Sequence, residues 1–265
     1  MRKEFHDVLG EAETAIMRIL EFSFLLQGFV FLTPYSWSSH RSAVSRSGYE
    51  SASKDFVPND LEVQVPGRVF LVTGGNSGIG KATALEIAKR GGTVHLVCRD
   101  QARAEDARSE IIRESGNQIT VSSGGMLVQK LNTDDLQSER TPFDGTMVYA
   151  QNKRQQVVLT EQWAQGHPAI HFSSMHPGWA DTPGVRQAMP GFHARFRDRL
   201  RSDAQGADTV LWLALSSAAA AQPSGCFFQD RKPVSTHLPL ARTFSSPAEE
   251  EKLIEILEQL AQTFK

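Results

Sequence analysis

Cysteine is scarce in this chain, which contains only Cys98 and Cys226 among 265 residues. Two cysteines cannot build the disulfide framework of a small secreted domain, and neither has a partner at metal-ligand spacing. Three histidines, His167, His171 and His176, likewise have no Cys, Asp or Glu partner at metal-ligand spacing. We therefore expect no metal site. No asparagine begins an Asn-x-Ser/Thr acceptor, so we expect an intracellular protein, either cytoplasmic or membrane-associated.

An excess of charge of one sign is also missing. The chain has 28 Lys and Arg against 30 Asp and Glu, which gives a net charge of −2. This balance excludes a disordered acidic tail and a basic protein that binds nucleic acid. One basic cluster is interpreted as a solvated segment over a substrate cleft, because its residues surround both sides of a helix. It consists of Arg195, Arg197, Arg199 and Arg201.

Long hydrophobic runs are absent. The most apolar stretch, residues 16–32, is interrupted by Arg18, Glu21 and Gln27, whereas a spanning helix needs about 20 nearly uninterrupted apolar residues. Acidic residues outnumber basic ones before this stretch, unlike the basic start of a signal peptide. Three alternatives stay open for residues 16–32: membrane contact, a helix packed on protein, or disorder.

The chain divides into three regions. Residues 1–60 are interpreted as an N-terminal extension that ends in a Ser-rich, aperiodic linker at 33–60. Residues 61–245 are expected to form the main domain, and residues 246–265 a terminal helix. Ser246, Pro247 and Glu249 together form a capping box with proline at the first helical position, which predicts the start of that helix.

Strand and helix patterns alternate through the main domain. Short apolar runs predict strands at 68–73, 93–98, 119–123, 169–175 and 225–229. Helices are predicted at 81–90, 101–115 and 147–164, and most of 195–217 is also expected to be helical. This order predicts an α/β fold with a Rossmann-like, doubly wound and mainly parallel sheet.

A glycine-rich turn joins the first predicted strand to the first predicted helix. It has the sequence TGGNSGIG at residues 73–80. Glycines in this position permit a tight turn and close approach of a pyrophosphate, whose charge is stabilised by the N–H groups at the helix start. Strand, turn and helix stand in the order that a dinucleotide site requires, which favours that function over a purely structural turn.

The second predicted strand ends at Cys98, Arg99 and Asp100. An arginine here offers a bidentate donor to a ribose 2′-phosphate, whereas an acid would accept from a 2′-hydroxyl. Arg99 therefore favours NADP(H) over NAD(H). A solvated arginine at a strand end is the alternative, and the adjacent Asp100 weakens the distinction.

Tyr149 and Lys153 stand four residues apart in a predicted helix, and hence on one face. A neighbouring cation favours the phenolate of a tyrosine, whose ordinary pKa of about 10 is too high for a neutral-pH base. Tyr149 is thus a candidate to exchange a proton with a substrate hydroxyl or carbonyl. Alone, a Tyr-x-x-x-Lys pair is a weak signal.

The order of four motifs makes this signal specific. The glycine turn is followed by VSS at 121–123, YAQNK at 149–153 and HPGWADT at 176–182. In this order they resemble the short-chain dehydrogenase/reductase superfamily, and the wording GRVFLVTGGNSGIGKATA is most similar to its retinol-dehydrogenase-like branch. The resemblance covers residues 65 to about 230.

The resemblance implies a role for each matching residue. It implies that Tyr149 is the general acid/base, that Lys153 holds the nicotinamide ribose and lowers the Tyr149 pKa, and that Ser123 orients the substrate, with Ser122 as the neighbouring candidate. A further set is implied to bind the cofactor. For the pyrophosphate it contains Gly74, Ser77, Gly78, Ile79 and Gly80, for the adenosine phosphate Asn76 and Arg99, and for the nicotinamide end Pro177, Gly178 and Thr182.

The sequence departs from the family pattern in the middle. Two strands with their helices should separate the helix ending near Ser115 from the strand at Ile119, but only Gly116, Asn117 and Gln118 stand there. Two such units occupy about 60 residues or more. The family's Asn-Asn-Ala-Gly strand end, its adenine-flanking Asp and its relay asparagine are absent from this sequence. A clean excision with intact motifs on either side resembles the product of exon skipping.

The missing units lead to a geometric prediction. We expect Ser123, Tyr149 and Lys153 to converge and the glycine turn to form, while the sheet between them is closed up or interrupted. Two functions follow as hypotheses. The first is an NADP(H)-dependent alcohol dehydrogenase or carbonyl reductase for small molecules, which the branch implies are lipid-like. The alternative is a catalytically inactive shortened variant that only binds partners or is unstable.

Overall fold

The computed structural model describes residues 43–75, 77–97, 117–238 and 240–263. Several expectations lie outside these residues: the apolar stretch 16–32, the first part of the linker at 33–42, Asn76, the strand end at 98–100 with Arg99, and the helix at 101–115. No helix in the described part of the chain has the length and apolarity needed to cross a membrane.

The described strands form two separate sheets. Strands β1 (Val69–Thr73) and β2 (Thr93–Val97) pair in parallel. A second sheet has the order β3-β4-β5-β6, in which only β6 is antiparallel. Its strands are β3 (Asn117–Val121), β4 (His171–His176), β5 (Phe227–Gln229) and β6 (Lys232–Pro233). No described strand joins β1 to β3, so the predicted interruption of the sheet is confirmed for this part of the chain.

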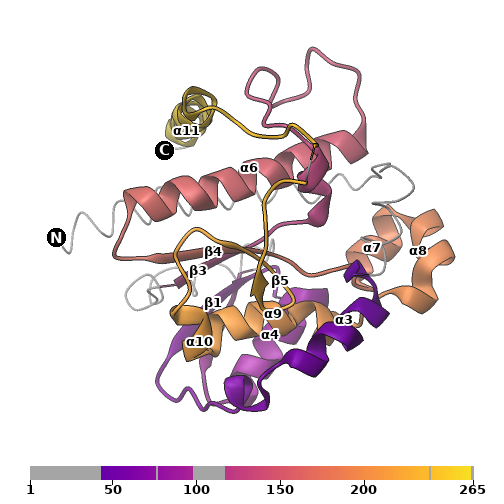
Figure 1. Ribbon diagram of the computed structural model, residues 1–265, viewed down its shortest axis with the longest axis vertical. Coiled ribbons are helices and arrows are strands. Elements are labelled where there is room, and N and C mark those ends of the chain that lie inside the picture. The colour runs from indigo at the N-terminus through magenta and orange to yellow at the C-terminus, as the bar shows by residue number, and fades with distance from the viewer. Residues whose placement is uncertain (1–42, 76, 98–116, 239, 264–265) are drawn as a thin grey trace.

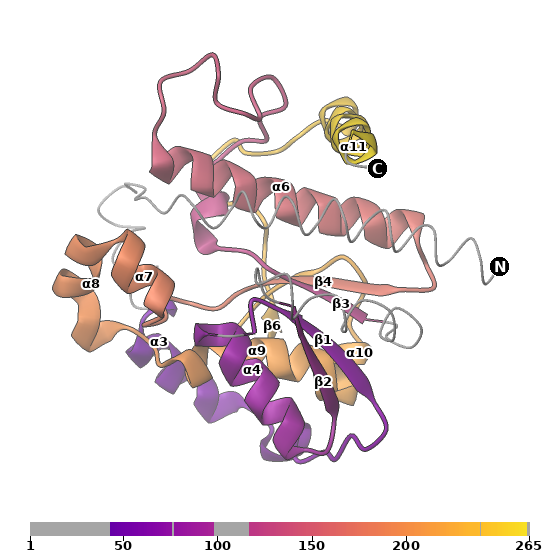
Figure 2. The ribbon, with the colours of Figure 1, turned by 180° about the vertical axis from the view of Figure 1, so that it is seen from behind.

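Helices cover both faces of the strands. Helix α6 (Gly145–Gly166) runs along one side of β3 and β4, whereas α4 (Gly78–Lys89) and α9 (Asp203–Leu215) lie on the other (Figures 1 and 2). The predicted boundaries of α4, α6 and the strands agree with the structure to within a few residues. The class is therefore α/β, as the alternation predicts.

Helix α9 joins the two sheets through side-chain packing. Ala207, Leu211 and Leu215 bury against Val65 and Ile87 beside the β1–β2 pair. Two residues on another side of α9, Trp212 and Leu213, bury against Met175 of β4 and Phe228 of β5. One helix thus contributes to both hydrophobic clusters. The core is continuous through α9, although the hydrogen-bonded ladder is not.

The terminal helix α11 (Pro247–Gln262) begins at the predicted capping box. Ser246 accepts from the Glu249 N–H, and the Glu249 carboxylate accepts from the Ser246 N–H. Leu253 is fully buried against Val158 and Leu159 of α6. The amphipathic pattern of α11 therefore covers the outer side of α6 (Figure 1).

Residues 43–61 differ from the linker that the Ser-rich composition predicts. They form α3 (Arg46–Ala52) and two 3-10 turns, η1 (Ser53–Asp55) and η2 (Pro58–Leu61). Asp60 accepts a 2.7 Å hydrogen bond from the indole of Trp212. Specific contacts with distant residues, which composition does not reveal, order this segment against the domain.

Most of 195–217 is helical, as expected, but it is divided among separate elements. Helices α7 (Pro183–Ala188) and α8 (Pro190–Phe196) are followed by η5 (Arg197–Arg199), and α9 starts only at Asp203. Between η5 and α9, Arg201 pairs with Ala180 in an isolated parallel β-bridge. Two short elements complete the fold, η4 (Gly124–Val128) and α10 (Ser217–Ala220).

Candidate active site

Ser123, Tyr149 and Lys153 converge at the carboxyl end of β3. Ser123 lies just beyond that strand and caps η4 by accepting from the Gly125 N–H at 3.2 Å. Tyr149 and Lys153 lie one turn apart near the start of α6. The Ser123 hydroxyl lies close enough to the Tyr149 phenol to influence its pKa, and the Lys153 ammonium lies 5.6 Å from the centre of the Tyr149 ring. The structure thus brings these three residues together.

Burial shapes the protonation of this cluster. It raises the pKa of Tyr149, and the nearby Ser123 hydroxyl opposes that rise. Burial also lowers the pKa of Lys153 to about 8. This differs from the expectation that Lys153 lowers the Tyr149 pKa. The reason is that desolvation of the phenolate dominates, while the ammonium is directed to other acceptors.

Those acceptors tie α6 to the end of β3. Lys153 Nζ donates to the carbonyl of Val121 at 2.9 Å and to Gln156 Oε1 at 3.0 Å. Ser122, which is almost fully buried, donates its hydroxyl to the backbone carbonyl of Lys153 at 2.9 Å. Because Ser122 is held in a backbone contact, Ser123 is the better placed of the two serine candidates.

The glycine turn forms as predicted between β1 and α4. Gly74 and Gly78 have φ values of +63° and +52°, which favour glycine. A Cβ at Gly80 would meet the backbone of Gly74, so the turn can close only around a glycine. The exposed Ser77 precedes α4 without capping it through its side chain, which leaves the first N–H groups of a 12-residue helix available to an anion.

Ile79 is turned away from such an anion. Its side chain packs with the cluster around Ile87 and Leu211, and a Cβ at Gly206 of α9 would lie 3.1 Å from Ile79 Cγ1. Of the predicted pyrophosphate residues, Ile79 can therefore contribute only its backbone.

The loop at 177–182 lies against the glycine turn. It follows β4, which pairs with β3, and it ends at Thr182, which caps α7 by accepting from the Val185 N–H at 3.2 Å. A Cβ at Gly78 would lie 3.1 Å from Thr182 Cγ2. The carboxyl ends of β1, β3 and β4 thus contribute to one region, where α/β folds bind ligands. A dinucleotide fits the residues that this part of the structure describes.

Sequence reasoning missed Arg201, Asp230 and Glu161. Arg201 was placed on a solvated surface, but its side chain is 1% exposed and forms a 2.6 Å ion pair with Asp230. The one sequence feature that hints at the burial of Arg201 is the preceding hydrophobic residue, Leu200, which is itself buried. A buried arginine depends on distant acceptors, which local spacing does not show.

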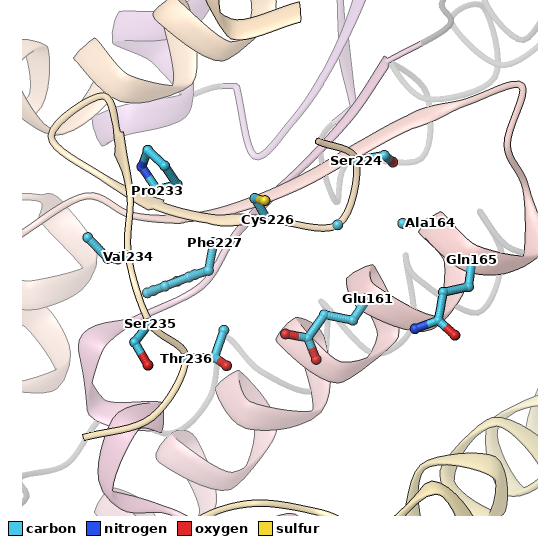
Figure 3. A pocket seen from close by; sticks show the side chains of 11 residues that line it. Glu161, Ala164, Gln165, Ser224, Cys226, Phe227, Pro233, Val234, Ser235 and Thr236 are labelled. Atoms are coloured by element: carbon cyan, nitrogen blue, oxygen red, sulfur yellow. The ribbon is translucent and has the colours of Figure 1, made fainter. Parts of the chain in front are cut away.

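Glu161 lines a separate cavity of about 580 Å³. Figure 3 shows its side chain extending from α6 toward Ser235 and Thr236, with Cys226 and Phe227 on the facing segment. Burial and the nearby Glu250 raise the pKa of Glu161 to about 7. Glu161 lies twelve positions after Tyr149 on α6, or about 18 Å at 1.5 Å per residue, so this cavity is distinct from the Ser-Tyr-Lys cluster. In the described part of the chain, no three His, Cys, Asp or Glu residues group as metal ligands.

Comparison with known proteins supports these observations. A family model described as short chain dehydrogenase matches residues 68–130, which include the glycine turn and Ser123. Among solved structures, an uncharacterized protein from Mycobacterium Paratuberculosis matches with a TM-score of 0.55 at 19% identity, covering 76% of this chain and 95% of that one. This likeness confirms the Rossmann-like fold.

Curated relatives match over a much longer range. The chain is 68% identical over 300 residues to Dehydrogenase/reductase SDR family member 12 of Homo sapiens, covering 83% of this chain and 95% of that protein. Retinol dehydrogenase 12 of Homo sapiens is 38% identical over 97 residues, which cover 37% of this chain and 28% of that protein. The first alignment is longer than this 265-residue chain, so that relative contains residues with no counterpart here.

With this identity to a relative that it covers almost completely, and with the motifs in their expected order, the chain belongs to the short-chain dehydrogenase/reductase family of NAD(P)(H)-binding oxidoreductases.

Proposed function

We propose that this chain is an NADP(H)-dependent alcohol dehydrogenase or carbonyl reductase. The observation that carries the proposal is the contact between the Ser123 hydroxyl and the Tyr149 phenol, with Lys153 one turn away. These groups lie at the carboxyl end of β3, in the domain proposed at 61–245. A phenol and a hydroxyl side by side are suited to bind one substrate oxygen between them.

In carbonyl reduction, Tyr149 would donate its proton to the substrate oxygen while Ser123 donates a hydrogen bond to the same atom. The raised pKa of Tyr149 keeps the phenol protonated at neutral pH, as a proton donor requires. Bound NADPH would supply the hydride. In the reverse direction, Tyr149 accepts the proton from the substrate hydroxyl.

Lys153 would hold the nicotinamide ribose. Its pKa of about 8 leaves it mostly charged at pH 7. For the pyrophosphate we propose the backbone of residues 74–80, and for the 2′-phosphate Arg99 with Asn76. Pro177, Gly178 and Thr182 would contact the nicotinamide end.

The substrate that we propose is lipid-like. Two large apolar side chains near the start of α6 are solvent-exposed, Phe143 at 59% and Met147 at 46%. Both stand within six residues of Tyr149 in the sequence, so apolar surface is exposed at the end of α6 that carries the proposed proton donor. The retinol dehydrogenases among the relatives are consistent with this class.

A titration tests this function. Purified chain that gives a cooperative thermal melt by circular dichroism is titrated with NADPH, and separately with NADH, while cofactor fluorescence is followed. Saturable binding with a preference for NADPH is expected, followed by turnover of long-chain or retinoid aldehydes. The absence of any saturable signal in a folded sample would exclude the function for this chain.

One observation favours a second candidate, a noncatalytic product. The β1–β2 pair has no ladder to β3 in the described residues, and unpaired strand edges promote association or aggregation. A broad, non-cooperative melt together with aggregation in the same circular dichroism experiment would support this candidate over the enzyme.

A further inference from the structure

Arg201 uses every donor of its guanidinium group within the buried interior. Two N–H groups donate to the Asp230 carboxylate at 2.6 and 3.0 Å. The other three donate to backbone carbonyls of Pro177 at 3.3 Å, Ser45 at 3.2 Å and Ala43 at 2.7 Å. A guanidinium has five N–H donors, so the side chain is fully satisfied. Arg201 therefore links the loop at 177–182 to the segment that precedes α3.

Backbone hydrogen bonds join the same segments. The Trp179 N–H donates to the Val44 carbonyl at 2.8 Å, the Arg201 N–H to the Trp179 carbonyl at 2.7 Å, and the Asp181 N–H to the Arg201 carbonyl at 2.8 Å. The loop thus lies between residues 43–45 on one side and the backbone of Arg201 on the other. Neither contact is local in sequence.

Gly178 is shaped to this arrangement. Its φ is +76°, and an added Cβ would run into the guanidinium of Arg201. The loop therefore passes directly over the Arg201 side chain, and only glycine at position 178 allows this close approach. At the other end of the loop, Thr182 contacts Gly78 of the glycine turn, so its position also bears on the pyrophosphate site.

A second ion pair anchors α3. Arg231 donates to both oxygens of Asp208 on α9 at 2.8 and 2.6 Å and lies 4.2 Å from the centre of the Phe56 ring. The Tyr49 hydroxyl lies near the same Asp208, and the pKa of Tyr49 is raised to about 12 by burial and by that carboxylate. The Tyr49 ring also lies 5.5 Å from the Arg201 guanidinium.

We propose that residues 43–49 act as a clamp which, through the positioning residue Arg201, holds the loop at 177–182 in the shape that receives the nicotinamide end of the cofactor. This inference rests on the proposed function for its consequence, but the clamp itself is a property of the fold. Arg201 does not bind the cofactor phosphate, since Asp230 neutralises its charge. Residues 43–49, whose composition predicts a linker, thereby help to position the cofactor-binding loop.

The test compares Arg201→Lys with Arg199→Lys. Lysine keeps the charge at 201 but presents one compact ammonium, which cannot span acceptors on three segments. Arg199 is exposed two residues away and serves as the matched control. Hydrogen exchange is measured for the amides of Trp179 and Asp181, with the Ser122 amide as an internal reference. Arg201→Lys is expected to raise exchange in the loop at least tenfold and to weaken NADPH binding about tenfold, whereas Arg199→Lys changes neither.

Tyr49→Ala is a second variant, with Tyr49→Phe as its control. Tyr49 lies on α3 and not in the loop, so a faster exchange of the Trp179 and Asp181 amides in Tyr49→Ala would show that α3 transmits the restraint. If loop exchange stays unchanged in both folded Arg201→Lys and Tyr49→Ala, the clamp is refuted. Failure of the parent chain to bind NADPH would refute the proposed function instead, and the exchange measurement would still decide on the clamp.

Discussion

The ammonium of Lys153 donates a hydrogen bond of 2.9 Å to the carbonyl oxygen of Val121, the last residue of β3. The residue proposed to hold the nicotinamide ribose is therefore also a tie between helix and strand. Both the hold on the ribose and the tie between α6 and β3 depend on whether Lys153 is protonated. Burial lowers the pKa of Lys153 from 10.5 to about 8.

The first prediction follows from this pKa. The kcat/KM of carbonyl reduction should fall as pH rises through about 8, because neutral Lys153 loses the charge with which it would hold the nicotinamide ribose. In Lys153→Arg the guanidinium stays charged at all accessible pH values, so that limb should disappear even if the maximal rate is lower. Initial rates between pH 6 and 10 measure this pH dependence in the parent chain and in Lys153→Arg. An unchanged limb at pH 8 in Lys153→Arg would assign the titration to another group.

The second prediction concerns Tyr149. Tyr149→Phe removes the phenolic proton and keeps the ring, so turnover should fall by about 10²–10⁴-fold, the usual contribution of a general acid. NADPH binding should be unchanged, because the phenol is proposed to act on the substrate oxygen. Single-turnover rates and a fluorescence titration measure the two quantities. A variant that retains full turnover would remove Tyr149 from the mechanism.

The third prediction concerns Gly78. Its φ of +52° is strained for any side chain, and a Cβ there would crowd Thr182 at 3.1 Å. Gly78→Ala should therefore destabilise the fold by about 1–2 kcal/mol and weaken NADPH binding at least tenfold. Gly191→Ala is the control, because nothing lies within 4 Å of a Cβ there. Urea unfolding and the NADPH titration measure both effects. Equal behaviour of the two variants would contradict the close contact between turn and loop.

The fourth prediction is a pH dependence of stability. The pKa of Glu161 is raised from 4.5 to about 7 by burial and Glu250, against the opposing effect of Arg154. Between these values the unfolded chain releases a proton that the folded chain keeps, so this group's contribution to stability falls as pH rises from about 4.5 to 7.

Glu161→Gln cannot ionise and should therefore be more stable than the parent above pH 7, by about 1 kcal/mol after allowance for solvent screening. The two should not differ through this charge below pH 4.5. Thermal melts across this pH range measure the difference, with the exposed Glu139→Gln as control. A constant offset at all pH values would show that Glu161 ionises normally.

The fifth prediction concerns the bridge made by α9. Leu211 is 5% exposed in the cluster beside β1 and α4, so Leu211→Ala should cost about 2–4 kcal/mol. Leu85→Ala on the surface of α4, where the side chain is 52% exposed, should cost far less. Denaturant melts measure both. Similar costs for the two variants would contradict the role of α9 as the link between the sheets.

Sequence alone predicts the parts of this molecule that local pattern controls. The glycine turn at 74–80, the pairing of Tyr149 with Lys153 and the capped start of α11 all depend on residues a few positions apart. The interruption of the sheet is also predictable, because residues 116–118 are too few for the missing strands and helices.

What sequence did not predict depends on distant partners. Residues 43–61 are Ser-rich and aperiodic, yet Asp60 meets Trp212 and the carbonyls of Ala43 and Ser45 meet Arg201. Arg201 was grouped with exposed neighbours because its acceptors lie 24 to 158 residues away. Spacing within a segment does not encode such contacts.

The packing of α9 on both sheets has a consequence for the width of the nucleotide crevice. In a continuous sheet, backbone hydrogen bonds hold neighbouring strands at about 4.8 Å. In the described residues no strand pairs with both β1 and β3, and the two are linked by side chains on two sides of α9. The sizes of residues such as Leu211 and Trp212 therefore influence the separation between the glycine turn and Tyr149. Substitutions in α9, which packs on Ile79 of that turn, should change how well a dinucleotide spans the two.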